Sequence, residues 1–196
     1  MDFDDFEDAL SEKLARSKKV AIIGVGADLR EDDAIGNLLA RDLVRAFQEK
    51  LKALGIDWLA FSDDEYVIAN DWMILNASVV PEQYITLLED FNPDCVFIVD
   101  AAQMGAAANP GDIAFIEKDE LDKVSFSTHT LSLRHFIEIL QTLGSSAEFI
   151  IGGVQPKLLD YGEELSPEVE QTRIFLRKFI IHFISDQFLD GGGLIA

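Results

Sequence analysis

Short apolar runs alternate along the chain with longer stretches in which apolar residues recur every three or four positions. The apolar runs have the length and composition of buried strands and cover residues 20–25, 72–75, 95–99 and 149–154. The stretches with helical spacing cover residues 33–54, 81–90, 131–143 and 167–187. Alternation of this kind is typical of a sheet with helices packed on it. We therefore expect an α/β fold: a single-domain, three-layer sandwich with a twisted, mostly parallel sheet of about five strands and helices on both faces.

Several boundaries of these elements have their own local signals. Gly55 follows the long helical stretch and is expected to end it. Ser166 and Pro167 predict a helix start, with the serine hydroxyl as the cap and proline at the first position. Residues 113–116 follow the preceding strand with no helix between, which favours an antiparallel edge strand. Residues 56–71 give no single pattern.

The two ends of the chain differ in character from the rest. Residues 1–18 are predicted to be an acidic N-terminal helix, because Phe3, Phe6, Leu10 and Leu14 form one apolar stripe. Residues 188–196 contain three consecutive glycines and are predicted to be a flexible tail. The whole chain, 1–196, is expected to be one domain.

The net charge of −20 narrows the classes of function. Nucleic-acid binding requires clustered Lys and Arg, so it is not expected. No stretch approaches the roughly 20 apolar residues of a membrane span, and the acidic start is unlike a signal peptide. Cys95 is the only cysteine and lies within an apolar run, which excludes an internal disulfide. We expect a cytoplasmic protein with no membrane insertion, and a monomer rather than an oligomer.

The loop after the first strand resembles a dinucleotide-binding turn only in part. Gly24 and Gly26 have the required spacing, but Leu29 occupies the third glycine position. The loop also contains Asp28, Glu31, Asp32 and Asp33, where a pyrophosphate would bind. Two like charges about 4 Å apart repel by roughly 4 kcal/mol at an effective dielectric near 20. A phosphate site is therefore excluded, and no tightly bound organic cofactor is expected.

The same acids, taken together with an aspartate and a histidine elsewhere in the chain, predict a cation-binding site. Asp100 follows the apolar run 95–99, and His129 precedes a helical stretch. In a parallel sheet, the carboxyl ends of these strands open onto one crevice. Carboxylates and an imidazole together suit a borderline divalent metal. Each residue also has an ordinary structural interpretation, as a cap, a turn residue or a buried histidine.

At this point the residues resemble a known family, the hydrogenase maturation endopeptidases. The resemblance extends in consistent order over about residues 19–186. Its motifs are Gly24-Val25-Gly26, Glu31-Asp32-Asp33-Ala34-Ile35-Gly36, Ile98-Val99-Asp100-Ala101, Asn109-Pro110-Gly111, Thr128-His129, Leu131-Ser132-Leu133 and Gly153-Val154-Gln155-Pro156. The spread of motifs is most similar to the branch that matures energy-converting nickel–iron hydrogenases.

The resemblance implies an endopeptidase of the aspartyl type that removes a C-terminal extension from a hydrogenase large-subunit precursor. It implies that Asp33, Asp100 and His129 contact a metal. The resemblance further implies that this metal is nickel already bound in the precursor, which is both partner and substrate. Asp28, Asp32, Asn76 and Thr128 are expected to contact substrate or to shape the loops, with Asp32 the alternative to Asp33 as ligand. No catalytic acid or base is assigned.

Two departures from the family pattern leave a second function open. The family usually has Gly-Asn after the first strand, where this chain has Gly26-Ala27. It also usually has an Asp-Gly-Gly-like turn where this chain has Asn76-Ala77-Ser78. An amide cannot replace a carboxylate in acid–base work. A non-catalytic maturation chaperone that inspects the metal is therefore the alternative, and a hydrolase of unrelated small substrates is a third possibility.

Overall fold

The computed structural model describes residues 2–62, 64–121, 125–126 and 130–190. Its helices are α1 (Phe3–Ala15), α2 (Ile35–Leu54), α3 (Ile85–Phe91), α4 (Thr130–Thr142) and α5 (Pro167–Asp190), with short 3-10 turns η1 (Glu31–Ala34), η2 (Pro81–Tyr84) and η3 (Lys118–Glu120). Its strands are β1 (Val20–Val25), β2 (Leu59–Ala60), β3 (Tyr66–Ala69), β4 (Trp72–Ser78), β5 (Cys95–Gln103), β6 (Ile113–Phe115), β7 (Ser125–Phe126) and β8 (Glu148–Val154).

One sheet forms the middle layer of the molecule. Its strand order is β2-β3-β4-β1-β5-β8-β6, and β7 pairs with β5 outside this path. The central strands β4, β1, β5 and β8 are parallel, as the sequence predicts. Antiparallel pairing adds β3 beyond β4, β6 beyond β8 and β7 beside β5. The described residues thus form eight strands rather than about five, because strands of two to four residues leave too short a pattern to recognise.

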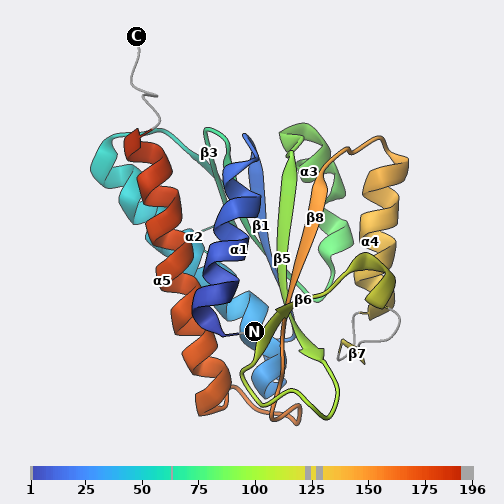
Figure 1. Cartoon of the computed structure of the whole chain (residues 1–196). Coiled ribbons are helices and arrows are strands. Elements are labelled where there is room, and N and C mark those ends of the chain that lie inside the picture. The colour runs from blue at the N-terminus through green and yellow to red at the C-terminus, as the bar shows by residue number, and fades with distance from the viewer. Residues whose placement is uncertain (1, 63, 122–124, 127–129, 191–196) are drawn as a thin grey trace.

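Helices cover both faces of this sheet, which confirms the three-layer α/β sandwich (Figure 1). Helices α1, α2 and α5 lie on one face, and α3 and α4 lie on the other. Alternate residues of the buried strands supply the two cores: Ile22 faces the first layer and Ile23 the second. Both faces of β1 are therefore apolar, as expected for a central parallel strand.

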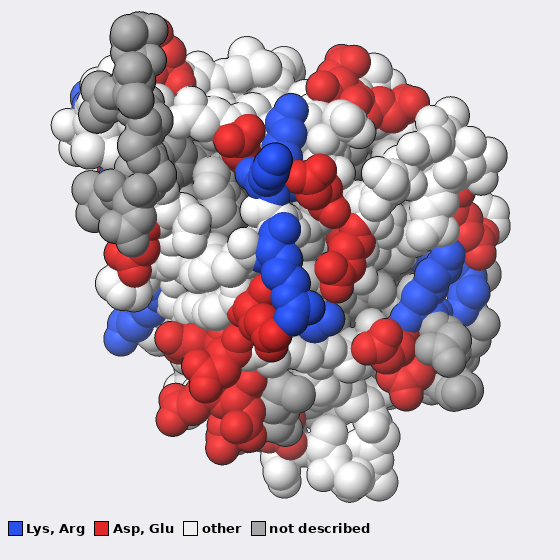
Figure 2. Space-filling model, turned by 45° about the horizontal axis from the view of Figure 1, so that its top comes forward, with Lys and Arg blue, Asp and Glu red and all other residues white. Residues whose placement is uncertain are grey.

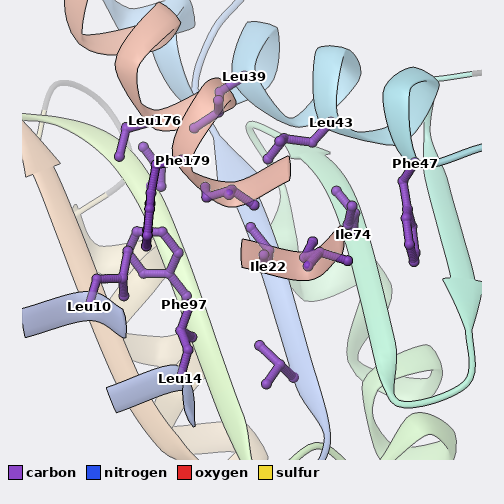
Figure 3. Packing of buried hydrophobic residues seen from close by; sticks show 14 of the residues in the cluster. Leu10, Leu14, Ile22, Leu39, Leu43, Phe47, Ile74, Phe97, Leu176 and Phe179 are labelled. Atoms are coloured by element: carbon purple, nitrogen blue, oxygen red, sulfur yellow. The ribbon is translucent and has the colours of Figure 1, made fainter. Parts of the chain in front are cut away.

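The larger core lies between the sheet and α1, α2 and α5 (Figure 3). Leu39, Leu43 and Phe47 of α2 point towards the sheet and are almost completely buried, as the helical spacing predicts. Gly55 takes a left-handed conformation and ends α2. Arg173 of α5 forms ion pairs with Asp42 of α2 and with Glu170, which ties the two helices together at the surface.

The predictions for the two ends of the chain differ in their outcomes. Helix α1 is present and buries Phe6, Leu10 and Leu14, so the N-terminal helix is confirmed. Helix α5 continues to Asp190, so the first three residues of the predicted tail are helical, and residues 191–196 lie outside the described part of the chain. The predicted antiparallel edge strand is β6.

The acidic composition is visible on the surface. Figure 2 shows that the Lys and Arg side chains on the face in view lie in small groups bordered by Asp and Glu. Among the described helices, none is long and apolar enough to cross a membrane.

Candidate active site

The candidate site lies at the carboxyl edge of the sheet, where β1 leads into η1 and α2. The start of α2 fits against the strands because of two glycines. A Cβ on Gly36 would lie 2.2 Å from the Val25 carbonyl oxygen. A Cβ on Gly24 would lie 2.0 Å from the Gly36 carbonyl oxygen. Gly24, which resembles part of a dinucleotide turn, thus serves close packing of helix on strand together with Gly36, and this packing fixes the position of η1 at the edge of the sheet.

Asp33 and Asp100 are brought together at this edge. Asp33 lies in η1, which packs against β5, and both side chains are completely buried. The sequence treats Asp100 as the residue after a strand, but β5 continues through it to Gln103. The reason is that β8 and β7 continue to pair with β5 beyond the end of β1. Asp100 is opposite Gly153 of β8, whereas the pairing with β1 stops one residue earlier, at Val99. On the side of β1, therefore, Asp100 stands just beyond the end of the neighbouring strand.

The environment of Asp100 opposes its ionisation. Burial raises the pKa of its carboxyl group well above the usual value, and the neighbouring charge of Asp33 raises it further. One hydrogen bond, from the Ala101 N–H to Asp100 Oδ1 at 2.7 Å, acts in the opposite direction. The other oxygen, Oδ2, is buried and accepts no hydrogen bond within the described residues. Two buried acids in one place favour a bound proton or cation over two free negative charges.

The side chain of Asp32, the neighbour of Asp33, accepts hydrogen bonds from a distant loop. Its Oδ2 accepts hydrogen bonds from the Lys157 N–H (2.8 Å), the Leu158 N–H (2.9 Å) and the Ser166 hydroxyl (2.9 Å). Its Oδ1 accepts from the Ser166 N–H at 2.6 Å. The side chain is completely buried. Asp32 therefore joins η1 to the loop between β8 and α5, whereas the charge of Asp33 acts on Asp100.

Asp28 and Asn37 form a second link within the first loop. The Asn37 amide is completely buried and donates to the Gly26 carbonyl and to Asp28 Oδ1. Asp28 Oδ2 pairs with Arg41, one helical turn further along α2. Asn37 thus supplies a side-chain amide to the loop in which Ala27 lacks one. None of the sequence motifs includes Asn37, although an asparagine in the otherwise apolar first turn of α2 is a signal of a buried polar role.

Asn76 lies inside β4 rather than after it, because the strand extends to Ser78. It is opposite Gly24 of β1. Its N–H donates to the Glu65 carbonyl at 2.7 Å, and its Oδ1 accepts from the Ser78 N–H at 3.3 Å. The Ser78 carbonyl in turn accepts from the Gly26 N–H at 3.0 Å, which connects the end of β4 to the first loop.

His129 and Thr128 lie outside the described residues, so their predicted roles stay predictions. The chain is described up to Phe126, which pairs with Ala102 of β5, and again from Thr130, where α4 begins. Among the described residues, no group of three or more His, Cys, Asp or Glu side chains could hold a metal ion. Two of the three predicted ligands, Asp33 and Asp100, are thus placed together.

Comparison with known proteins agrees with this architecture. A sequence profile of hydrogenase maturation proteases matches residues 62–181. A protein of Methanocaldococcus jannaschii assigned as a hydrogenase maturation protease is 31% identical over 180 residues, which cover 92% of this chain and 96% of the relative. The hydrogenase 3 maturation protease of Escherichia coli is 26% identical over 71% of this chain and 74% of its own length.

Among solved structures, a NiFe hydrogenase maturation protease of Thermococcus kodakarensis KOD1 superimposes with a TM-score of 0.66 at 27% identity. The match covers 90% of this chain and 99% of that structure. Profile, sequence and fold therefore agree over most of the length. This chain belongs to the hydrogenase maturation protease family.

Proposed function

We propose that this protein is the endopeptidase that removes a C-terminal extension from the nickel-loaded large-subunit precursor of a NiFe hydrogenase. The observation that carries the proposal is the buried pair of Asp33 and Asp100 at the carboxyl edge of the sheet. Edges of this kind are where α/β proteins bind ligands. The family supplies the reaction class, since its members are named as hydrogenase maturation proteases.

In this proposal, the nickel ion belongs to the precursor and is recognised as part of the substrate. Asp33, Asp100 and His129 would contact it. The chemistry of the described pair fits a cation, because Asp100 is buried beside a second acid and its Oδ2 accepts no hydrogen bond within the described residues. A positive charge would remove the repulsion between the two carboxylates that raises the pKa of Asp100.

Recognition of the metal would also decide where the chain is cut. Residues that grip a fixed point of the precursor hold the adjoining peptide bond in one place, and such positioning is a large part of catalysis. A divalent ion supplies polarisation of a carbonyl or a lower pKa of a bound water. We assign no acid or base to the cleavage step. We place the reaction in the cytoplasm and expect the enzyme to act as a monomer.

Asn76 motivates the alternative, a chaperone that inspects the metal without cutting. Its side-chain oxygen accepts the Ser78 N–H, so the amide is used to shape the end of β4. The side-chain amide of Asn76 does not ionise near neutral pH, so Asn76 itself cannot act as a general acid or base. The chaperone retains the contacts with the precursor and loses only the cleavage.

The two functions are separated by incubating the protein with its precursor in nickel-loaded and nickel-free forms. The endopeptidase shortens only the nickel-loaded form, which mass spectrometry reports as loss of the C-terminal extension. His129→Ala is expected to abolish this processing without unfolding the protein, and Asp90→Asn, an exposed change at the other end of the sheet, is the matched control. Binding of the precursor with no shortening would establish the chaperone. Equal shortening of both forms would contradict recognition of nickel.

A further inference from the structure

Two segments far apart in sequence form a continuous surface beside Asp33. We call it the rim surface: residues 29–31 before η1, and residues 157–164 between β8 and α5. The Glu31 N–H donates to the Gly162 carbonyl at 3.0 Å, and the Gly162 N–H donates to the Leu29 carbonyl at 3.1 Å. In Figure 1 the loop after β8 passes below the start of α2, at the lower edge of the molecule. The carboxyl edge that holds the candidate site therefore continues onto this surface.

Hydrogen bonds between its two segments hold the rim surface in one conformation. Arg30 Nη2 donates to the Leu159 carbonyl at 3.1 Å, and the Asp160 N–H donates to Glu31 Oε2 at 3.0 Å. Asp32 adds the four hydrogen bonds described above, of which the two from Ser166 are buried and the two from Lys157 and Leu158 are partly buried. A surface that is already ordered loses little conformational entropy when a partner binds, and this lowers the cost of association.

Its exposed side chains combine apolar and acidic character. Tyr161 is 82% exposed, Leu29 45% and Leu158 42%. Leu29 and Tyr161 lie at or next to the backbone bonds that join the two segments, and the Leu158 carbonyl accepts a bond from the Asp32 N–H at 3.3 Å. Exposed tyrosine and leucine side chains gathered in one place are typical of a protein interface rather than of inert surface.

The acids of the rim surface make it negatively charged. Asp160, Glu163 and Glu164 are exposed, and none of them has an ion pair within the described part of the chain. The two basic residues of the surface are already engaged. Arg30 points to a backbone carbonyl, and Lys157 pairs with Glu168 at 2.7 Å. The surface therefore presents uncompensated negative charge together with exposed apolar side chains.

We propose that the rim surface is the docking site for a segment of the precursor that carries basic and apolar side chains. This proposal rests on the proposed function, because it takes the same precursor as partner. Charge complementarity selects a basic segment. Continuity with Asp33 places the docked segment beside the metal-recognising pair, so that docking and metal contact act on one substrate at once.

The test reverses charge at the rim surface and at a matched remote site. Glu163→Lys with Glu164→Lys changes two adjacent exposed acids of the rim surface. Glu89→Lys with Asp90→Lys makes the same change at the end of α3, at the opposite end of the sheet. Both double variants have the same net charge, so a general effect of charge would be equal in the two.

The rim variant is expected to raise the KM for the nickel-loaded precursor, and the Kd measured by biolayer interferometry, by about tenfold. The rise in KM should exceed any fall in kcat, and the remote variant should stay within about twofold of the wild type. Tyr161→Ala, which removes the most exposed of the three apolar side chains without changing charge, is expected to raise the Kd as well. Circular dichroism melts confirm that each variant is folded.

The outcomes separate this proposal from the proposed function. Equal Kd values for the rim variant, the remote variant and the wild type would overturn docking while leaving cleavage intact. Binding that depends on the rim surface without any cleavage would overturn the endopeptidase while leaving docking intact. A dimer in light scattering that disappears in Tyr161→Ala would assign the surface to self-association instead, and would overturn the proposal.

Discussion

Replacement of Asp32 tests how the candidate site is held in place. In Asp32→Asn, one of the two carboxylate oxygens becomes an N–H donor of the same size. The best orientation keeps the oxygen at the Oδ2 position, where it still accepts the three bonds from Lys157, Leu158 and the Ser166 hydroxyl. The new amide nitrogen then faces the Ser166 N–H, so two donors meet in a buried position.

The loss in the free energy of unfolding can be estimated from these hydrogen bonds. A buried N–H left without an acceptor costs about 1–3 kcal/mol, and three charge-assisted bonds that become neutral lose about 1 kcal/mol each. Removal of the buried negative charge returns part of this as relieved desolvation. We expect Asp32→Asn to lower the free energy of unfolding by about 2–4 kcal/mol, a large share of the ~5–15 kcal/mol that is usual for a domain.

Urea unfolding at pH 7 with linear extrapolation measures this change. Hydrogen exchange should also become faster at Ser166, whose amide proton loses its acceptor, and to a smaller extent at Lys157 and Leu158, whose acceptor becomes a neutral oxygen. Asp160→Asn, an exposed neighbour in the same loop, is the control and should stay within about 0.5 kcal/mol of the wild type. If Asp32→Asn also remained within that range, the four hydrogen bonds would not be what joins η1 to the loop.

Three further predictions follow from buried groups. Burial and the charge of Asp33 raise the pKa of Asp100 in the folded protein. The protonated carboxyl group therefore contributes its full stability below the pKa of the unfolded chain, about 4, and this contribution is lost as the pH rises through the folded pKa. Asp100→Asn should therefore be more stable than the wild type at pH 7, by about 1 kcal/mol or more, with the advantage vanishing in urea titrations towards pH 4. Gly36→Ala places a methyl group against the Val25 carbonyl and should destabilise by about 3 kcal/mol or more; an unchanged melting temperature would contradict the packing. Burial raises the pKa of the Cys95 thiol to about 11, so Ellman's reagent should label it only after unfolding, and rapid labelling of the native protein would show it to be accessible.

Elements with strong local signals were predictable from the sequence. The strand at residues 20–25, the helix that ends at Gly55 and the start of α5 all match. In each case the periodicity or the end signal is complete within a few residues. The continuation of β5 past Asp100 was not predictable in this way, because its cause is pairing with β8 and β7, which come later in the chain.

In the candidate site, too, some features are evident from the sequence and others depend on long-range contacts. The sequence singles out Asp32 and Asp33 as a run of acids, but only the folded chain tells them apart. Ser166, which lies 134 residues further along the chain, donates two hydrogen bonds to Asp32, whereas the charge of Asp33 acts on Asp100. Residue type gave the candidates, and long-range contacts assigned their roles.

In the proposed function, the buried pair of Asp33 and Asp100 recognises the nickel-loaded precursor. The most direct measurement is the rate of precursor cleavage by Asp33→Asn and Asp100→Asn, compared with Asp90→Asn under single-turnover conditions. We predict a fall of about 100-fold or more for each of the first two variants and no change for the third, with all three folded. Cleavage at the wild-type rate by folded Asp33→Asn and Asp100→Asn would contradict the claim.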